Sequence, residues 1–307
     1  MSDMDRLMVC VCTCNRPELL AQLIQAVERN ATAVKSWLHV GMVIVDDSLL
    51  ETARTTVEKF SATFDLGLIY LTTASGNISV ARNTALDAGV PLADWLLMTD
   101  DDCEPVDNWV ELMVNSITTH SVDAVTGPQQ LRPQPSSPQW MTEQPFFERT
   151  DAFHAGETIT TGSTFNFGIR SQWLAEHPHV RFREDLGKLG GEDAVFFNQA
   201  TGEGMQMVFD ASALVYETLT PQRSNYAYLI RSQFWVGNSE GKTNLYLGSA
   251  SKPRLFARGT KRAAKFAAAP FVHLAKLRAP QFRYNASRVV NACGLITSAF
   301  GIEIRHH

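Results

Sequence analysis

The sequence predicts an α/β fold with a mostly parallel sheet and helices on both of its faces. Short β-branched, apolar runs alternate with helical stretches, so the first hundred residues give the order strand, helix, strand, helix, strand, helix, strand. Of 307 residues, 45% are hydrophobic and 19% charged, which suits a full core and excludes collagen-like or disordered chains. Polar clusters follow three of the four predicted strands.

The elements are predicted in order from periodicity and from helix-start signals. Arg16-Pro17-Glu18 opens the first helix, where Leu and Ile recur at helical spacing. Other helical stretches run to about residue 64 and over residues 77–88. The predicted strands are residues 7–14, 40–45, 66–71 and 95–99.

The five cysteines do not predict a metal site or a disulfide framework. Alternation along the first strand would place Cys10, Cys12 and Cys14 on one face, without chelating turns. An odd count with no pairing pattern fits a reducing compartment. The acidic start of the chain lacks the features of a targeting segment, and no run of about 18 apolar residues is present. These observations predict a cytoplasmic protein, soluble or peripheral to a membrane.

Charge is divided unevenly along the chain. Residues 252–307 hold eleven Lys and Arg residues and one acid, Glu303, so this segment carries +10 and residues 1–251 carry −15. Apolar residues such as Phe256, Phe271 and Leu277 are interleaved with the charges, as in a helix that lies on anionic lipid. A nucleic-acid arm and a helical pair docked on the acidic body are the alternatives. The acidic body and the lack of a recognition motif count against the nucleic-acid arm.

Three strand ends are expected to converge on one crevice, because ligands bind at the carboxyl ends of parallel strands. These ends are residues 13–16, 46–48 and 100–102. Consecutive carboxylates repel one another and are costly to bury without a cation. Asp100, Asp101 and Asp102 together therefore suggest a hard divalent ion, Mg²⁺ or Mn²⁺, bound together with a phosphate-bearing substrate. The alternative is that these aspartates cap a helix, and Asp46 and Asp47 allow the same interpretation.

The sequence has no G-x-G-x-x-G after its first strand and no G-x-x-x-x-G-K-[ST] segment. Four segments in order instead resemble the nucleotide-sugar-binding motifs of family 2 glycosyltransferases with the GT-A fold, a Rossmann-like α/β fold. The segments are Val11-Cys12-Thr13-Cys14-Asn15-Arg16-Pro17, Ile44-Val45-Asp46-Asp47-Ser48, Gly76-Asn77-Ile78-Ser79-Val80-Ala81-Arg82-Asn83 and Leu97-Met98-Thr99-Asp100-Asp101-Asp102.

The resemblance implies a role for each matching position in binding a nucleoside-diphosphate sugar. Asp47 would accept a hydrogen bond from the imide of a uracil. Asp100 would lie near the ribose, and Asp102 would hold the metal that binds the diphosphate. The other positions expected around the nucleotide are Thr13, Asn15, Arg16, Asn77, Arg82 and Asp101. A plain surface charge on a helix is the alternative for Arg82.

The same resemblance divides the chain into a donor-binding half, residues 1–126, an acceptor-binding and catalytic half, residues 127–250, and a basic helical tail, residues 251–307. Residues 127–141 hold four prolines and are expected to form a loop between the halves. Residues 161–167 match the strand that returns under the donor sugar. This strand would bring Gly162, Ser163 and Asn166 to the donor sugar or the acceptor, unless it is a plain edge strand.

Glu192 and Asp193 match the acidic pair of inverting enzymes. Asp193 would be the general base, because an acceptor alcohol must lose its proton as the new bond forms. Glu192 would orient acceptor or sugar hydroxyls. The alternative is an acidic first turn of the helix predicted at residues 194–200, which the helix dipole favours.

The chain departs from the family pattern in two places. Tyr216 and Glu217 stand where the family often has a histidine near the metal, so metal ligation there is open. Arg223 and Ser224 follow and could close over the diphosphate. The Gln-x-x-Arg-Trp pattern of processive synthases is absent, which favours addition of a single sugar.

The sequence thus predicts an inverting, metal-dependent glycosyltransferase that uses a UDP-sugar and a lipid-linked saccharide acceptor at the inner face of the cytoplasmic membrane. It is similar to bacterial exopolysaccharide glycosyltransferases of the succinoglycan type. A sugar-phosphate nucleotidyltransferase would need a glycine-rich basic loop that residues 12–17 lack. A non-catalytic nucleotide-sugar-binding protein is the other alternative, and the Glu192-Asp193 pair argues against it.

Overall fold

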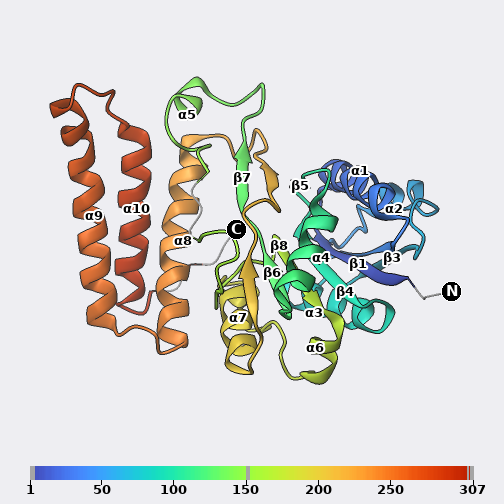
Figure 1. The fold of residues 1–307 in the computed structure, drawn as a ribbon. Helices are drawn as coiled ribbons and strands as arrows, with labels where there is room; N and C mark the ends of the chain where they lie inside the picture. The colour runs from blue at the N-terminus through green and yellow to red at the C-terminus, as the bar shows by residue number, and fades with distance from the viewer. Residues whose placement is uncertain (1–3, 150–152, 303, 305–307) are drawn as a thin grey trace. The chain divides into compact units, whose positions relative to one another are not determined.

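The computed structural model describes residues 4–149, 153–302 and 304 (Figure 1). It divides into two compact units that are built from alternating parts of the chain. Unit 1 comprises Met1–Gln130, Arg149–Gly187 and Glu192–Thr218, and unit 2 comprises Leu131–Glu148, Lys188–Gly191 and Leu219–His307. These units are defined by packing, so the donor, acceptor and tail boundaries at residues 126 and 250 stay predictions.

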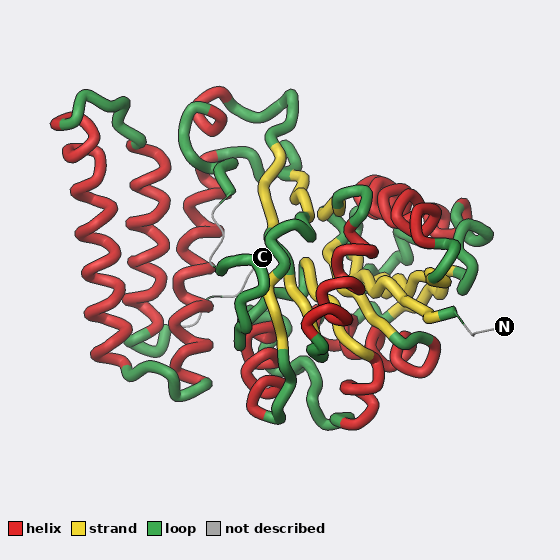
Figure 2. Tube along the Cα trace, in the orientation of Figure 1, coloured by secondary structure: helices red, strands yellow, loops and turns green. Residues whose placement is uncertain are grey.

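Unit 1 is built around a seven-stranded sheet in the order β3-β2-β1-β4-β8-β6-β9 (Figure 2). All adjacent strands pair in parallel except those that involve β8, which is antiparallel to both β4 and β6. The predicted mostly parallel α/β sheet is therefore confirmed. The strands are β1 (Asp5–Thr13), β2 (Leu38–Asp46), β3 (Leu68–Thr72), β4 (Trp95–Asp100), β6 (Ala124–Thr126), β8 (Asn166–Arg170) and β9 (Met207–Phe209).

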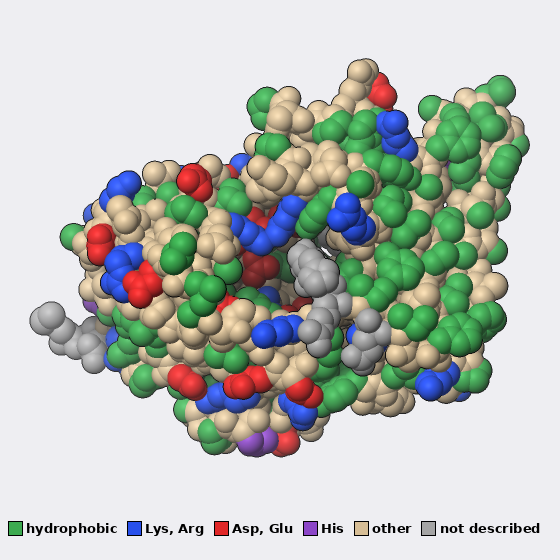
Figure 3. Space-filling model, turned by 180° about the vertical axis from the view of Figure 1, so that it is seen from behind, with side chains coloured by type: hydrophobic (Ala, Val, Ile, Leu, Met, Phe, Trp, Pro, Cys, Tyr) green, Lys and Arg blue, Asp and Glu red, His purple; other side chains and the backbone are tan. Residues whose placement is uncertain are grey.

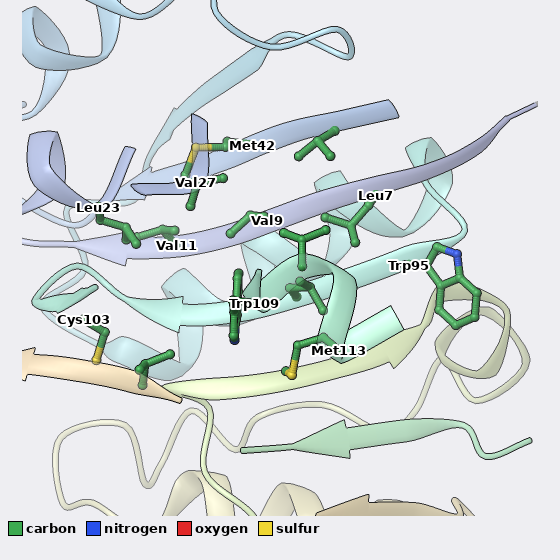
Figure 4. Packing of buried hydrophobic residues seen from close by; sticks show 14 of the residues in the cluster. Leu7, Val9, Val11, Leu23, Val27, Met42, Trp95, Cys103, Trp109 and Met113 are labelled. Carbon is green, nitrogen blue, oxygen red and sulfur yellow. The ribbon is translucent and has the colours of Figure 1, made fainter. Parts of the chain in front are cut away.

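Helices cover both faces of this sheet, because residues along each central strand point alternately to one face and the other. In β1, Leu7, Val9 and Val11 join the core beneath α1, α2 and α4 (Figure 4), whereas Met8 and Cys10 join the core beneath α3, α6 and α7. The helices are α1 (Pro17–Val34), α2 (Arg54–Lys59), α3 (Ile78–Gly89), α4 (Trp109–His120), α6 (Ser171–Glu176) and α7 (Glu192–Gly202), with a 3₁₀ turn at Val90–Leu92.

A second sheet of three strands corrects one prediction for the middle of the chain. Its order is β5 (Cys103–Pro105), β10 (Val215–Thr218) and β7 (Gln129–Arg132). Residues 127–141, expected to be a loop, contain β7 and the short helix α5 (Gln139–Thr142). β7 has no apolar alternation, and pairing supplied by the tertiary fold makes it a strand. The strand predicted over residues 161–167 begins only at Asn166.

The last part of unit 2 is a bundle of three helices, α8 (Tyr226–Tyr246), α9 (Lys252–Ala275) and α10 (Phe282–Ser298). α10 packs against both α8 and α9, as Figure 1 shows. The predicted basic helical extension is thus confirmed as helical. Among the helices of the described residues, none is both long and apolar enough to cross a bilayer.

Candidate functional site

The turn after β1 directs two side chains toward the acidic turn after β4. β1 ends at Thr13, and Asn15 takes the left-handed conformation, with φ of 58°, that asparagine tolerates well. Arg16 occupies the position before the first helical residue of α1, and Pro17 follows at that first position. Thr13 and Arg16 are thereby placed beside Asp101: the Thr13 hydroxyl donates to Oδ2 at 2.8 Å, and the Arg16 guanidinium donates to Oδ1 at 2.8 Å.

The acidic turn itself is largely buried. The Arg16 guanidinium also donates to Asp102 Oδ2 at 2.9 Å. The side chains of Asp101 and Asp102 are 4% and 8% exposed, whereas that of Asp100 is 38% exposed. Burial raises the pKa of the Asp101 carboxyl to about 6, and desolvation also raises the pKa of Asp100. The Arg16 guanidinium therefore pairs with two of the three carboxyls, those of Asp101 and Asp102.

Arg82 joins this turn to the acidic pair at the start of α7. It lies on the inner face of α3, is 8% exposed, and donates to Glu192 Oε1 at 2.5 Å. Its other terminal nitrogen is 3.6 Å from Asp100 Oδ1. Asp193 follows Glu192 and is half-buried. Desolvation and the neighbouring Glu192 carboxylate raise the pKa of the Asp193 carboxyl to about 6, against the opposing charge of Arg82.

Five carboxyl groups therefore surround two guanidinium groups in unit 1. Asp100, Asp101 and Asp102 come from the turn after β4, Glu192 and Asp193 from the first turn of α7, and the cations are Arg16 and Arg82. On the face drawn in Figure 3, acidic side chains lie recessed beside basic ones. The predicted residues from the ends of β1 and β4, the inner face of α3 and the start of α7 are brought together.

Asparagines of α3 hold the chain segment that follows α6. The Asn83 side chain donates to the carbonyl of Phe182 and accepts from its N–H, each at 2.9 Å. Asn77 caps α3 by accepting from Ser79 N–H and donates to the carbonyl of Glu184. The guanidinium of Arg82 lies 5.6 Å from the Phe182 ring centroid. Asn83 had no predicted role, although its place directly after Arg82 in the same motif is a signal for one.

Asp46 at the end of β2 and Asp47 directly after it accept hydrogen bonds from two loops, the one that follows β2 and the one that precedes α3. Asp46 is buried and accepts from the N–H groups of Ser48 and Ala53 and from the Tyr70 hydroxyl. Asp47 Oδ1 accepts from the backbone and side chains of the loop that precedes α3, whereas Oδ2 accepts from Asn77 N–H at 2.8 Å. A carboxylate oxygen has two acceptor positions, so Oδ2 of Asp47 can accept one further donor.

The three residues predicted to contact sugar differ in their surroundings. Gly162 lies against the Phe197 ring, and Ser163 is half-buried. Asn166 is fully buried: its amide donates to the carbonyls of Pro128 and Ala213, and its carbonyl accepts from the Trp109 indole. These bonds give Asn166 a framework role and leave it no exposed atom for a sugar.

The predicted residue Arg223 and the glycine pair before Glu192 belong to unit 2. Arg223 lies before α8, with its guanidinium 6.0 Å from the Tyr228 ring centroid. Gly190 and Gly191 have φ of 83° and 92°, a region that other residues rarely adopt. A Cβ at Gly191 would approach Thr243 Oγ1 to 2.0 Å. Glycine is therefore required in the segment that leads into Glu192.

The clustered carboxyl groups do not form a complete metal-binding site within the described residues. No group of three or more His, Cys, Asp or Glu side chains is placed to hold a metal ion in the described part of the chain. β10 pairs Tyr216 with Glu104 and Glu217 with Cys103, and Thr218 N–H donates to the carbonyl of Asp102. The segment that stands in place of the family histidine thus borders the acidic turn.

Unit 1 also has a polar cavity of about 440 Å³ that no sequence motif predicts. None of the predicted site residues lines it. Its lining residues are Asn83, Asp87, His179, Arg181, Phe182, Arg183, Glu184 and Gln199.

Comparisons with known proteins agree with the fold and the motifs. The model of the family described as "Glycosyl transferase family 2" matches residues 8–177. The succinoglycan biosynthesis protein ExoM of Rhizobium meliloti (strain 1021) is 31% identical over 232 residues, which are 76% of this chain and 73% of that protein.

Crystal structures of S. aureus TarS residues 1–349 share the fold. The complex with UDP gives a TM-score of 0.56 at 17% identity and covers 96% of this chain and 91% of the TarS chain. The complex with UDP-GlcNAc gives 0.57 at 15% identity, with 96% and 92% covered.

Proposed function

The chain belongs to glycosyl transferase family 2, and from that premise we propose that it transfers a single sugar, with inversion, from a UDP-sugar to a saccharide acceptor. The observation that carries the proposal is the meeting of the Asp100–Asp102 turn and the Glu192-Asp193 pair around Arg82. A donor site and a base must be adjacent for group transfer in one step, and this cluster supplies both kinds of group.

The donor nucleotide is proposed to bind at the ends of β1, β2 and β4. The remaining acceptor position of Asp47 Oδ2 suits the imide N–H of uracil. Arg16, with 35% of its side chain exposed, can turn part of its charge toward the diphosphate. Asn15 and Asn77 border the same loops, and the proposal keeps Gly162 and Ser163 for sugar contacts.

A divalent cation fits the charge of this cluster. Five carboxyls outnumber two guanidiniums, and desolvation by burial raises the pKa of Asp100 and Asp101 despite the opposing charges of Arg82 and Arg16. Mg²⁺ and Mn²⁺ keep few protein ligands and use substrate phosphates for the rest, so two aspartates without a third ligand are compatible with such an ion. Asp102 and Asp100 would hold it. When bound, the ion would neutralise charge on the departing diphosphate.

Asp193 is proposed as the general base and Glu192 as its orienting partner. The acceptor hydroxyl oxygen forms a bond to the anomeric carbon as the bond from that carbon to the diphosphate breaks. The hydroxyl proton passes to the Asp193 carboxylate, and the electron pair leaves with the diphosphate. A pKa of about 6 suits this task, because the group is ionised at neutral pH yet more basic than an ordinary aspartate. Arg223 is proposed to add charge beside the leaving group.

The acceptor is proposed to be a lipid-linked saccharide; the name of the ExoM relative, a succinoglycan biosynthesis protein, supports a place in exopolysaccharide synthesis. Residues 252–307 hold eleven Lys and Arg residues against one acid. Each such charge near an anionic leaflet contributes about 1 kcal/mol. We therefore propose that the enzyme binds peripherally at the inner face of the cytoplasmic membrane, where such an acceptor would be presented.

The test is calorimetric titration of nucleoside diphosphates into wild type and Asp102→Ala, with Mn²⁺, with Mg²⁺ and with chelator. We expect UDP to bind with either metal, and both chelator and the substitution to abolish that binding. Asp65→Asn, an exposed aspartate of unit 1, is the matched control and should bind as wild type does. Absence of nucleotide binding under every condition would refute the donor site.

A further inference from the structure

The three-helix bundle of unit 2 is packed through small and polar residues. A Cβ at Gly237 of α8 would lie 1.9 Å from the carbonyl oxygen of Asn291, and one at Gly294 of α10 would lie 2.0 Å from that of Phe234. The backbones of α8 and α10 are therefore in direct contact. Asn238 donates from α8 to the carbonyl of Ile302 at 3.0 Å.

The large apolar side chains of unit 2 lie mainly outside this bundle. The core that the bundle shares is formed by Ala250, Leu255, Leu295 and Ala299, with Leu245 packed against it. In contrast, Figure 3 shows hydrophobic side chains spread over the outer surface of the helical unit. The exposed set is Val236, Tyr246, Phe256, Phe271, Val272, Leu274, Leu277, Phe282, Phe300 and Ile302. Helices in water bury such residues, whereas contacts between small residues with polar side chains as links are typical of helices in lipid.

The exposed apolar residues are most concentrated where α9 turns into α10. Residues 266–275 contain no Lys, Arg, Asp or Glu. In and next to this stretch, Phe271 is 69% exposed, Leu277 97% and Phe282 55%. We call residues 266–282 the α9–α10 tip. Several large apolar side chains at one end of a bundle form a patch of the kind that marks an interaction site.

The charged residues around the tip indicate the kind of surface that it binds. The sequence has no Asp or Glu between Glu240 and Glu303, so every charged side chain of α9 and α10 is basic. Lys276 and Arg278 lie in the turn itself. Two copies of such a surface would repel each other, whereas a bilayer with anionic headgroups and an apolar interior matches both the charges and the apolar side chains.

We propose that the α9–α10 tip inserts into the boundary between headgroups and acyl chains of an anionic bilayer. Phe271, Leu277 and Phe282 would be buried there, while Lys276 and Arg278 would reach the phosphates. The inference rests on the membrane association proposed above and adds the segment that enters the lipid. Charge alone would give binding that salt reverses, whereas insertion adds a hydrophobic contribution that salt does not screen.

The experiment is flotation of the full chain with vesicles of phosphatidylcholine and phosphatidylglycerol, at low and at high salt. The variant Phe271→Ser with Leu277→Ser removes apolar area and keeps every charge. Its matched control is Leu49→Ser with Leu50→Ser, two leucines of unit 1 that are 82% and 85% exposed. Leu277→Trp, with Leu50→Trp as control, reports depth through quenching by brominated acyl chains.

We expect wild type and the Leu49 and Leu50 control to stay bound at high salt. The tip variant should bind about one to two orders of magnitude more weakly, since two large side chains no longer leave water. Brominated acyl chains should quench the added fluorescence of Leu277→Trp and should not quench that of the Leu50→Trp control. Binding that high salt abolishes would overturn insertion and leave the peripheral association intact. No vesicle binding at low salt would overturn both. A change in oligomeric state in the tip variant, with vesicle binding unchanged, would assign the patch to a second copy.

Discussion

Arg82 is the residue on which the two acidic parts of the site depend. Its guanidinium contacts Glu192 and approaches Asp100, and it is surrounded by protein rather than water. A buried cation between carboxylates keeps them ionised and close, and its loss would leave unpaired charges in a poorly hydrated site.

Asp193→Asn should retain UDP binding and lose turnover. A general base contributes about 10²- to 10⁴-fold to rate, so kcat should fall by that factor while the dissociation constant of UDP changes little. Single-turnover kinetics and calorimetry measure the two effects. Asp65→Asn should keep the wild-type kcat. A variant with unchanged kcat would exclude Asp193 as the base.

The pH dependence of kcat should follow ionisation of Asp193. The base acts only when deprotonated, and its pKa is raised to about 6, so kcat should rise with pH up to about 6 and level off above it. Below that pKa, each further pH unit should lower kcat about tenfold. An acid limb near the ordinary pKa of aspartate would contradict the burial of this carboxyl.

Arg82→Gln should move that acid limb to higher pH. The positive charge of Arg82 lowers the pKa of Asp193, so its removal lets the pKa rise further. Stability should also fall by about 3–5 kcal/mol, the usual cost of breaking a buried ion pair. Arg181→Gln is the control, because its partner Asp87 is 64% exposed and such pairs contribute about 0–1 kcal/mol. Urea denaturation and the pH profile measure the two quantities.

At the scale of elements, α3 holds the chain segment that precedes α7, the helix that begins with the proposed Glu192-Asp193 pair. Its capping residue Asn77 and its inner-face residue Asn83 bond to the backbone of residues 182–184, ahead of α7. The packing of α8 against α10 relies instead on close contact between their backbones at Gly237 and Gly294.

Gly237→Ala should destabilise the bundle by about 1–3 kcal/mol, because its methyl group would collide with the carbonyl oxygen of Asn291. Gly202→Ala is the control: nothing lies within 4 Å of a Cβ there, and its φ is not positive. That substitution should be neutral or stabilise by about 0.4–1 kcal/mol. Thermal unfolding followed by circular dichroism compares the two variants. Equal midpoints would show that the bundle tolerates separation of α8 and α10.

At the scale of the whole molecule, an acidic body is linked to a basic tail. Residues 1–251 carry −15, so a nucleoside diphosphate approaches a chain of its own charge sign. Binding at the acidic cluster therefore requires compensation, which is the role proposed for the cation.

UDP with Mn²⁺ should stabilise the folded protein, and chelator should remove the gain. At a ligand concentration of a hundred times Kd, the stabilisation is about 2.7 kcal/mol. A thermal shift assay measures it. Asp102→Ala should show no shift with the same additions. A shift that persists in chelator would mean that the nucleotide binds without the cation.

The sequence by itself determined the order of elements over the first hundred residues and the identity of the acidic groups. Apolar runs at period two and at helical spacing are local signals, and strand ends in a parallel sheet converge by geometry. Residues 7–14 and 77–88 could therefore be predicted within a few residues, and the four motifs in order led to the family that comparison confirms.

Only the tertiary structure decided what each polar group does. Arg82 was predicted near the nucleotide, but its contact with Glu192 joins residues 110 positions apart in the sequence. Asn166 was predicted to meet a sugar and instead bonds three segments of the core. Tertiary structure likewise decided that β7 forms a strand and that the apolar residues of the α9–α10 tip are exposed. Pairing, burial and pKa depend on neighbours that the fold brings from distant positions, and no local pattern encodes them.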